Sequence, residues 1–269
     1  MGVQFWGRWV LRFTLLVVVN TLEARGVKES YQNFERYSIL DGLSQSLVQD
    51  IVQDNTGYMW FATGNGLSRY DGYEFKVFRR EQSNNKTLTG DYIKALLVDS
   101  SGILWVGTLG DGLNVYTHDD ESFELFNLGL DENGLEIYEL FEDSQSRIWV
   151  GTNKGLYSIS KNRKNTKSHN KALRLDDTIV TTITQTKDGS IWIGTNTAEL
   201  LAISSITHEQ SVYEGSLSGL KGLEITSILP ISEDALFVGT SRNGVYSYKS
   251  SSNTFVKEHL FDDKLGEVG

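Results

Sequence analysis

The densest cluster of side chains that could do chemistry is a run of acidic residues near the middle of the chain. Its members are Asp131, Glu132, Glu136, Glu139, Glu142 and Asp143. Oxygen ligands of this kind hold hard cations such as calcium, but the spacing matches no calcium-binding loop. The four histidines, His118, His169, His208 and His259, have no partner at metal-ligand spacing, so we expect each to be solvated. The sequence therefore predicts no metal site and no cofactor.

Motifs and composition argue against catalysis and against nucleic-acid binding. The chain has no HExxH, no Walker glycine loop, no GxSxG and no kinase phosphoacceptor segment. Its formal net charge is -10, whereas a nucleic-acid-binding domain normally presents a basic face. It has no cysteine, which excludes disulfides and thiolate metal sites. We therefore expect a chain without catalytic residues, which binds its partner without turnover.

The elements that must position any binding residues are marked by a repeated quartet: a bulky aromatic, a β-branched or aromatic residue, a small residue and a threonine. The five copies lead with Trp60, Trp105, Trp149, Trp192 and Phe237, at intervals of 45, 44, 43 and 45 residues. Arrays of one supersecondary unit have periods of this length. The chain is therefore predicted to be one unit written five times.

Other positions keep step with the quartet and define the unit. Nine residues before each lead aromatic stands an apolar residue of a first strand, which is Ile51, Leu96, Leu140, Ile183 or Ile228. A polar turn joins that strand to the quartet, because Asp can bond its own backbone and Gly can take positive φ. A third strand opens at a Gly-Leu or Gly-Val pair, and a fourth is seen at 75–78, 123–126 and 255–260. A four-stranded meander of this kind is the blade of an all-β propeller.

The residue types of the quartet suit the stacking of blades. Side chains alternate along a strand, so the aromatic ring and the small residue two positions later share one face. A ring beside a missing side chain lets adjacent blades approach closely without a void. We interpret the quartet as structural, and not as a cofactor or sugar site. Its structural residues are Trp60, Trp105, Trp149, Trp192, Phe237, Gly107, Gly151, Gly194, Gly239, Thr63, Thr108, Thr152, Thr195 and Thr240.

The apolar strand, the Asp-x-x-Gly turn, the Leu-Trp-Val-Gly-Thr strand and the following Gly-Leu together resemble the two-component regulator propeller repeat. The resemblance covers about residues 34–269 and is closest at 37–44 and 60–78. It implies the periplasmic sensor propeller of a hybrid histidine kinase or a diguanylate cyclase. The chain departs from the pattern at Glu199, which replaces a turn glycine expected to need positive φ, and in the fifth unit at Phe237 and Glu233-Asp234.

The two ends of the chain indicate export and a longer propeller. Arg8 and Arg12 precede or enter an apolar run at 13–19, and a small residue follows at Ala24, which outlines a signal peptide over residues 1–25. We expect a periplasmic propeller over residues 31–269, in a protein anchored in the inner membrane. Residues 34–39 are interpreted as a lone fourth strand. Because family propellers are usually seven-bladed, the five blades are expected to be the N-terminal part of a seven-bladed or tandem propeller.

Ligand contacts are expected from loops that gather at one face of a propeller. Those entering the innermost strands are 39–47, 83–92, 128–137, 174–179 and 215–224, and those joining second and third strands are 64–66, 109–112, 153–155, 196–199 and 241–243. The candidate ligand-binding residues are Asn65, Asp111, Asn153, Asn196, Glu199 and Asn243. Residues 161–171, rich in Lys and Asn, are expected to form a mobile loop between the third and fourth units.

The expected function is the sensing of a small molecule or an oligosaccharide by part of a membrane-bound signalling protein, with self-association as a sensor dimer. The kinase or cyclase domain would lie farther along a full-length protein. Two alternatives stand beside this hypothesis: an exported propeller enzyme, either acting on glycans or a quinoprotein, and a protein-interaction scaffold. An enzyme would need convergent carboxylates across the channel or a cofactor cradle.

Overall fold

The computed structural model describes residues 35–130, 133–204, 210–213, 223–232, 234–252 and 254–258. The expected signal peptide and residues Asp131, Glu132, His208, Glu233 and His259 lie outside this part. The chain separates into two units, Met1–Tyr37 and Ser38–Gly269, and all of the described strands lie in the second. Among the described residues, no helix has the length and apolarity needed to cross a membrane.

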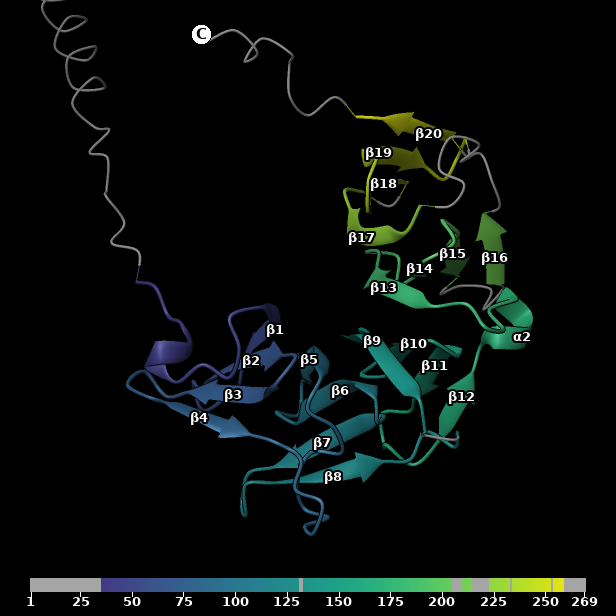
Figure 1. The fold of residues 1–269 in the computed structure, drawn as a ribbon. Helices are drawn as coiled ribbons and strands as arrows, with labels where there is room; N and C mark the ends of the chain where they lie inside the picture. Colours follow the sequence, from purple (N-terminus) through teal and green to yellow (C-terminus); the bar gives the residue numbers. More distant parts are fainter. Residues whose placement is uncertain are drawn as a thin grey trace, which may run out of the picture. The chain divides into compact units, whose positions relative to one another are not determined.

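The strands of the second unit come in groups of four along the chain (Figure 1). The first group is β1 (Val48–Gln53), β2 (Met59–Thr63), β3 (Gly66–Tyr70) and β4 (Phe75–Phe78). The second is β5 (Ile93–Val98), β6 (Leu104–Gly110), β7 (Leu113–Thr117) and β8 (Ser122–Phe126). The third is β9 (Leu135–Glu142), β10 (Ile148–Thr152), β11 (Gly155–Ile159) and β12 (Thr166–Ser168). The fourth is β13 (Val180–Gln185), β14 (Ile191–Thr195), β15 (Leu200–Ile203) and β16 (Gln210–Tyr213), and the fifth is β17 (Ile225–Pro230), β18 (Ala235–Thr240), β19 (Gly244–Lys249) and β20 (Thr254–Lys257).

Each group is an antiparallel meander in which the strands pair in chain order. The second and third groups are also joined into one eight-stranded sheet, because the end of β6 pairs with the start of β9. The paired residues there are Leu109 with Glu136 and Gly110 with Leu135. Five four-stranded blades confirm the predicted all-β propeller fold.

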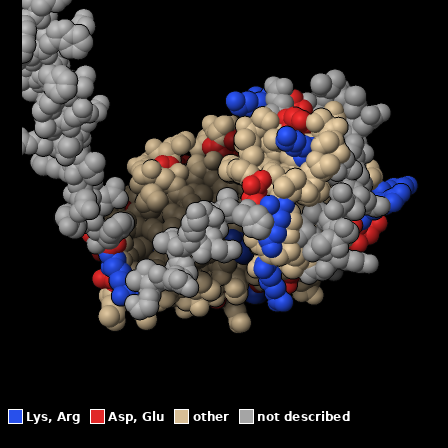
Figure 2. Space-filling view, turned by 90° about the horizontal axis from the view of Figure 1, so that it is seen from above, with Lys and Arg blue, Asp and Glu red and all other residues tan. Residues whose placement is uncertain are grey.

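The blades follow one another around an arc within this unit, and the first strand of each lies on the inner side (Figure 1). These inner strands, β1, β5, β9, β13 and β17, each contact the next in the series. All five shift register against the quartet strand by one extra residue, which is Gln49, Lys94, Tyr138, Thr181 or Thr226. Such a β-bulge leaves one residue unpaired and bends the strand. Figure 2 shows a hollow whose visible walls are mostly formed by residues other than Lys, Arg, Asp and Glu.

The lead aromatic residues lie between blades. Trp60 is fully buried and packs in one cluster with Leu96 and Val106 of the second blade. The lead tryptophans of the next three blades are buried against the following blade in the same way. Phe237, which leads the last quartet, is only partly buried. The blade-to-blade core therefore consists of a ring from one blade set against the aliphatic strands of the next.

The close approach of adjacent blades favours a small residue at the third position of the quartet. A Cβ added to Gly107 would stand 2.6 Å from Cγ2 of Ile137 in the next blade, closer than Cβ contacts allow. A Cβ at Gly194 would stand equally close, 2.6 Å, to Cγ2 of Ile225. At Gly239, in the last blade, the nearest atoms would be side chains of its own blade. The interfaces at Gly107 and Gly194 thus leave no room for a methyl group, whereas the interface between the first two blades holds the buried methyl of Ala62.

The threonine of the quartet closes the turn into the third strand. Oγ1 of Thr108, for example, donates to the carbonyl oxygen of Gly112 at 2.8 Å. In the fourth blade, where Glu199 replaces this glycine, the positive φ falls instead on Ala198, at 67°. The expected change of turn in the fourth blade is therefore present.

Two local predictions are wrong. Residues 35–38 form no strand, and Ile39–Asp41 is a 3-10 helix, η1. Ser38 begins this helix, because its Oγ accepts a hydrogen bond from the backbone N–H of Leu40 at 3.2 Å. Phe34, at the start of the predicted strand, lies outside the described residues.

The second error concerns residues 161–171, which were expected to form a mobile loop but are not a loop throughout. They include β12 and the first residues of a short helix, α2 (Asn170–Leu173). His169 is buried and not solvated, with its ring centroid 4.8 Å from that of Trp149 and Nε2 3.0 Å from Oγ of Ser158. The prediction failed because the segment is polar in sequence, yet its last residues fold back onto the third blade.

Candidate ligand-binding site

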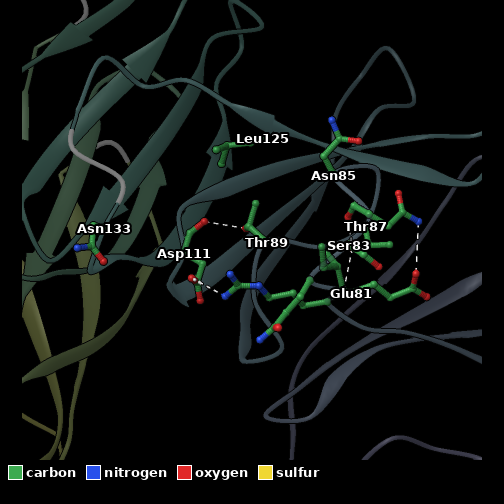
Figure 3. Close-up of a pocket in the computed structure, with 12 residues that line it drawn as sticks. Glu81, Ser83, Asn85, Thr87, Thr89, Asp111, Leu125 and Asn133 are labelled. Carbon is green, nitrogen blue, oxygen red and sulfur yellow. Dashed lines mark hydrogen bonds and ion pairs between the residues drawn. The ribbon is translucent and has the colours of Figure 1, made fainter.

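A pocket of about 730 Å³ lies beside the entry loop of the second blade, residues 79–92 (Figure 3). Three of the loops expected at the binding face meet here. They are 83–92, 109–112 through Asp111, and 128–137 through Asn133. Leu125 of β8 adds an apolar side chain. The volume falls in the range of roughly 300–1,000 Å³ that small-molecule pockets occupy.

Hydrogen bonds fasten the entry loop at both ends. The backbone N–H of Arg80 donates to Oδ1 of Asp91 at 2.7 Å. Near the other end, the backbone N–H of Thr89 donates to Oδ1 of Asn114 at 3.1 Å, and Oγ1 of Thr89 donates to the carbonyl oxygen of Asp111 at 2.7 Å. The loop is therefore a supported platform, and its central residues face the pocket.

The side chains at the centre of the loop are free to bind. Gln82, Ser83 and Asn85 line the pocket, and their side chains have no hydrogen-bond partner in the described part of the chain. Arg80 and Asp111 both line the pocket and form an ion pair, with 3.5 Å between Nη1 and Oδ1, which a dashed line from Asp111 marks in Figure 3. Their side chains are 51% and 41% exposed, so this ion pair is weak and exchangeable. The pocket thus offers amide, hydroxyl, guanidinium and carboxylate groups to a polar ligand.

Asn153 and Asn196, predicted as ligand contacts, hold strands of their own blades. Oδ1 of Asn153 accepts a hydrogen bond from the backbone N–H of Glu136 at 3.1 Å. Oδ1 of Asn196 accepts one from the backbone N–H of Ile179 at 3.2 Å. In both cases the backbone N–H of the asparagine returns a hydrogen bond to the same residue's carbonyl oxygen. Each therefore ties the turn after the quartet to the start of the inner strand.

Asn65, Glu199 and Asn243 lie in the corresponding turns of the first, fourth and fifth blades. The side chain of Asn243 donates to Oη of Tyr246 at 2.6 Å and accepts from Nζ of Lys257 at 2.9 Å. Of the six predicted residues, Asp111 alone lines the pocket. A ligand role for the other five stays a prediction.

Several lining residues were missed by the sequence. Arg80, Glu81 and Gln82 precede the loop start expected at residue 83. The fourth strand was correctly expected to end at Phe78, so the polar run that begins at Arg79 could have marked the true start of the loop. Leu125 could not be found this way, because it belongs to a strand that the periodic pattern marks as structural.

A smaller hollow of about 300 Å³ lies where the outer parts of the first and second blades meet. Four of its six charged lining residues form ion pairs, and the other two, Arg79 and Glu81, hydrogen-bond to the carbonyl oxygen of Asn65 and to the side chain of Asn84. Glu121 accepts from Lys76 and, at 2.8 Å, from Arg69, and these hydrogen bonds lower the pKa of its carboxyl group. Lys86 pairs with Asp120 at 2.8 Å. We interpret this region as a contact between blades and not as a ligand site.

The fold and the pocket define a class: a β-propeller whose blade-entry loops form a polar pocket. Four segments, residues 42–65, 87–110, 131–154 and 174–197, match the family described as the two component regulator propeller. They cover the inner strand and the quartet of the first four blades. These four segments are therefore similar to the repeats of a regulatory, non-catalytic propeller domain.

Solved structures with this fold include extracellular domains of bacterial proteins. The extracellular domain of a putative hybrid two-component system from B. thetaiotaomicron is 24% identical, with a TM-score of 0.70 over 82% of this chain and 31% of that one. The extracellular domain of a putative one-component system from the same bacterium is 16% identical, with a TM-score of 0.64 over 81% of this chain and 30% of that one. At these identities the likeness shows the fold alone.

A curated relative also matches part of the chain. Histidine kinase P4 of Formosa agariphila is 35% identical over 75 residues, which are 27% of this chain and 6% of the kinase. The chain therefore spans less than a third of each of these three proteins.

Proposed function

We propose that the chain is the periplasmic ligand-sensing propeller of a membrane-bound signal-transduction protein, a histidine kinase or a diguanylate cyclase. The family match supports a regulatory propeller, and the relatives named above are a histidine kinase and extracellular domains of signalling systems. Self-association as a sensor dimer belongs to the same proposal. The signalling domain would lie elsewhere in the full-length protein.

The pocket beside residues 79–92 carries this proposal. It combines uncommitted amide and hydroxyl groups with the loose ion pair between Arg80 and Asp111. Convergent groups of this kind suit a small polar molecule or an oligosaccharide, whose hydroxyls both donate and accept hydrogen bonds. Because the pocket joins two loops of the second blade to the loop entering the third, an occupant would bridge neighbouring blades.

A thermal-shift screen of oligosaccharides and small polar metabolites tests the proposal. A ligand at a hundredfold excess over its Kd stabilises the folded state by about 2.7 kcal/mol. Asn85→Ala and Asp111→Ala should abolish that shift, whereas Glu124→Ala, an exposed change on β8, should leave it intact. A shift that survives both pocket variants would place the ligand elsewhere. Chemical conversion of a hit by the purified chain would support the enzyme alternative instead.

Export is tested separately. A fusion of residues 1–40 to alkaline phosphatase, which is active only after export, should be active in whole cells. An inactive fusion that accumulates in the cytoplasm would contradict the periplasmic assignment, and it would leave the ligand experiment unaffected.

A further inference from the structure

The inner strands of the first three blades bring three charged residues into one neighbourhood. Lys94 is the bulged residue of β5, whereas Asp50 of β1 and Glu139 of β9 each follow the bulge of their own strand. β5 contacts both β1 and β9. The strand that carries Lys94 therefore lies in contact with two strands that each carry one of the carboxylates, and each strand belongs to a different blade.

The hydrogen bonds of this group leave Glu139 without a partner. Oδ2 of Asp50 accepts from the backbone N–H of Leu96, across the blade interface, at 2.8 Å. Nζ of Lys94 donates to Oε1 of Gln49, also across the interface, at 3.2 Å. In the described part of the chain, Glu139 has no hydrogen bond, and no ion pair joins Lys94 to either carboxylate.

The strands around Glu139 supply no other charge. β6, β10 and β13, which pack against β9, contain no charged residue. On β9 itself, Glu136 accepts from Oη of Tyr138 at 2.6 Å, and Glu142 accepts from the backbone and side chain of Ser100 in the second blade. From the neighbouring strands, it is Asp50 and Lys94 that act on Glu139.

The protonation of Glu139 follows from these surroundings. Burial and, after it, the negative charge of Asp50 raise the pKa of Glu139 to about 8, against the opposing charge of Lys94. Burial also raises the pKa of Asp50, against hydrogen bonds from the backbone of Leu96 and Ile51. Near neutral pH, Glu139 is therefore mostly an uncharged acid, and it ionises in a pH range in which ordinary glutamates are already charged.

We propose that Glu139 is a proton-sensitive contact that favours packing of the first three inner strands when neutral and weakens it when ionised. The charged form places a second negative charge near Asp50, at a partly buried position where solvent screens it incompletely. A change in external pH would then alter how tightly these blades are held.

The direction in which stability changes with pH follows from the linkage between folding and proton binding. The folded chain retains a proton that the unfolded chain releases near 4.5, the ordinary pKa of a glutamate. The contribution to stability is fully present below that value and is lost as the pH rises toward and through about 8. Over this window the unfolding equilibrium constant should rise by up to about tenfold per pH unit.

Urea unfolding between pH 6.0 and 9.5 tests the proposal. The wild-type chain should become less stable as the pH rises, and Glu139→Gln should show a smaller slope and greater stability than wild type at pH 9. Glu124→Gln, an exposed acid on β8, is the matched control and should follow the wild type. Equal slopes in Glu139→Gln and wild type would overturn the proposal.

Two neighbouring variants distinguish this contact from simple packing. Asp50→Asn should move the transition to lower pH, because a like charge is removed. Lys94→Met should move it to higher pH, because the opposing cation is lost. A carbon-13 NMR titration of the Glu139 carboxyl in the wild-type chain checks the result without any substitution. A midpoint near 4.5, the ordinary glutamate value, would overturn the proposal even if every variant failed to fold.

Discussion

The indole Nε1 of Trp105 donates a hydrogen bond to Oδ2 of Asp99 at 2.8 Å, and both side chains are buried. The same pair, six residues apart, recurs as Trp60 with Asp54 at 2.7 Å and as Trp149 with Asp143 at 2.8 Å. In the fifth blade the ring is phenylalanine, which has no N–H to donate, and the position six residues earlier is Ile231. In the fourth blade the ring is Trp192 but the position six residues earlier is Thr186, so the acid is lost there while the tryptophan is kept.

Asp99→Ala should destabilise the fold by about 2–4 kcal/mol, since it leaves a buried indole N–H without its acceptor and removes two turn hydrogen bonds. Those turn bonds come from the backbone N–H groups of Ser101 and Ile103. Urea unfolding measures the change. Ile231→Ala, at the same position of the last blade, is the control and should cost much less. Equal costs would mean that the aspartate acts only as an exposed turn former.

The hydrogen bonds to Asp99 also predict acid sensitivity. Burial would raise the pKa of this carboxyl, but hydrogen bonds from Trp105 and Arg163 outweigh it, and the net pKa is lowered. A lowered pKa contributes stability above the unfolded value and loses it as the pH falls toward the folded value. Wild type should therefore lose stability below about pH 4 more steeply than Asp99→Asn. If wild type and Asp99→Asn lose stability equally as the pH falls, the lowered pKa of Asp99 is contradicted.

Gly107→Ala should cost about 1–3 kcal/mol, because overpacked cores must shift side chains or backbone. The added methyl would meet Ile137 of the next blade. Gly239→Ala makes the same change in the last blade, where the added methyl would meet Oγ of Ser227, a hydroxyl that can rotate away, and should cost less than Gly107→Ala. Thermal unfolding of the two variants compares them directly. A Gly239→Ala cost as large as that of Gly107→Ala would show that contacts within a blade, such as the one with Ser227, suffice to select glycine.

His169 predicts a second pH dependence, opposite in direction to that of Glu139. Burial, together with the charges of Lys167 and Arg147, lowers the pKa of His169 to about 4. The folded chain should lose about 3 kcal/mol of stability as the pH falls from about 6.5 to about 4, since the unfolded chain gains a proton that the folded chain excludes. His169→Phe should lose this slope in thermal melts, and His118→Phe, at an exposed position, should keep it. A slope unchanged in His169→Phe would contradict the burial argument.

The last blade presents an apolar face. Leu229 is 62% exposed and Val256 59%, whereas Leu97, the counterpart of Leu229 in the second blade, is partly buried by the blade that follows. Exposed apolar patches favour self-association. Leu229→Ser combined with Val256→Ser should lower self-association in sedimentation velocity at little cost in Tm. Leu97→Ser should instead lower Tm. Unchanged association in the double variant would show that another surface is responsible.

The sequence predicted the blades well because their spacing is fixed by packing. A bulky ring meets the next blade once per unit with a small residue beside it, so the period is visible without any structure. β4 was predicted to the residue, at 75–78. The inner bulge was not predicted, since one extra polar residue at Gln49 or Lys94 leaves the spacing of the apolar positions unchanged.

The candidate site was harder to predict, because turn-forming and ligand-binding residues share the same chemistry. Asn153 looked like a polar group on a variable loop, but its amide is occupied by the inner strand of its own blade and the residue before it. Gln82 and Asn85 are free because they lie at the centre of a long loop, and sequence shows the length of that loop but not the direction of its side chains. His169 was wrongly expected to be solvated for a related reason. It is buried because the chain beside α2 folds back, and no periodic pattern in the sequence indicates that fold-back.

The pairing of β6 with β9 has a consequence for how such a protein can change over evolution. Repeat proteins gain and lose whole units by duplication and deletion, and an exchange is tolerated where the break falls in a loop. A break between the second and third blades would instead sever the ladder at Leu109 and Gly110. These two blades should be inherited as one block, so chimaeras with a donor propeller should refold when residues 104–142 come from one parent, and fail when a crossover falls inside that span.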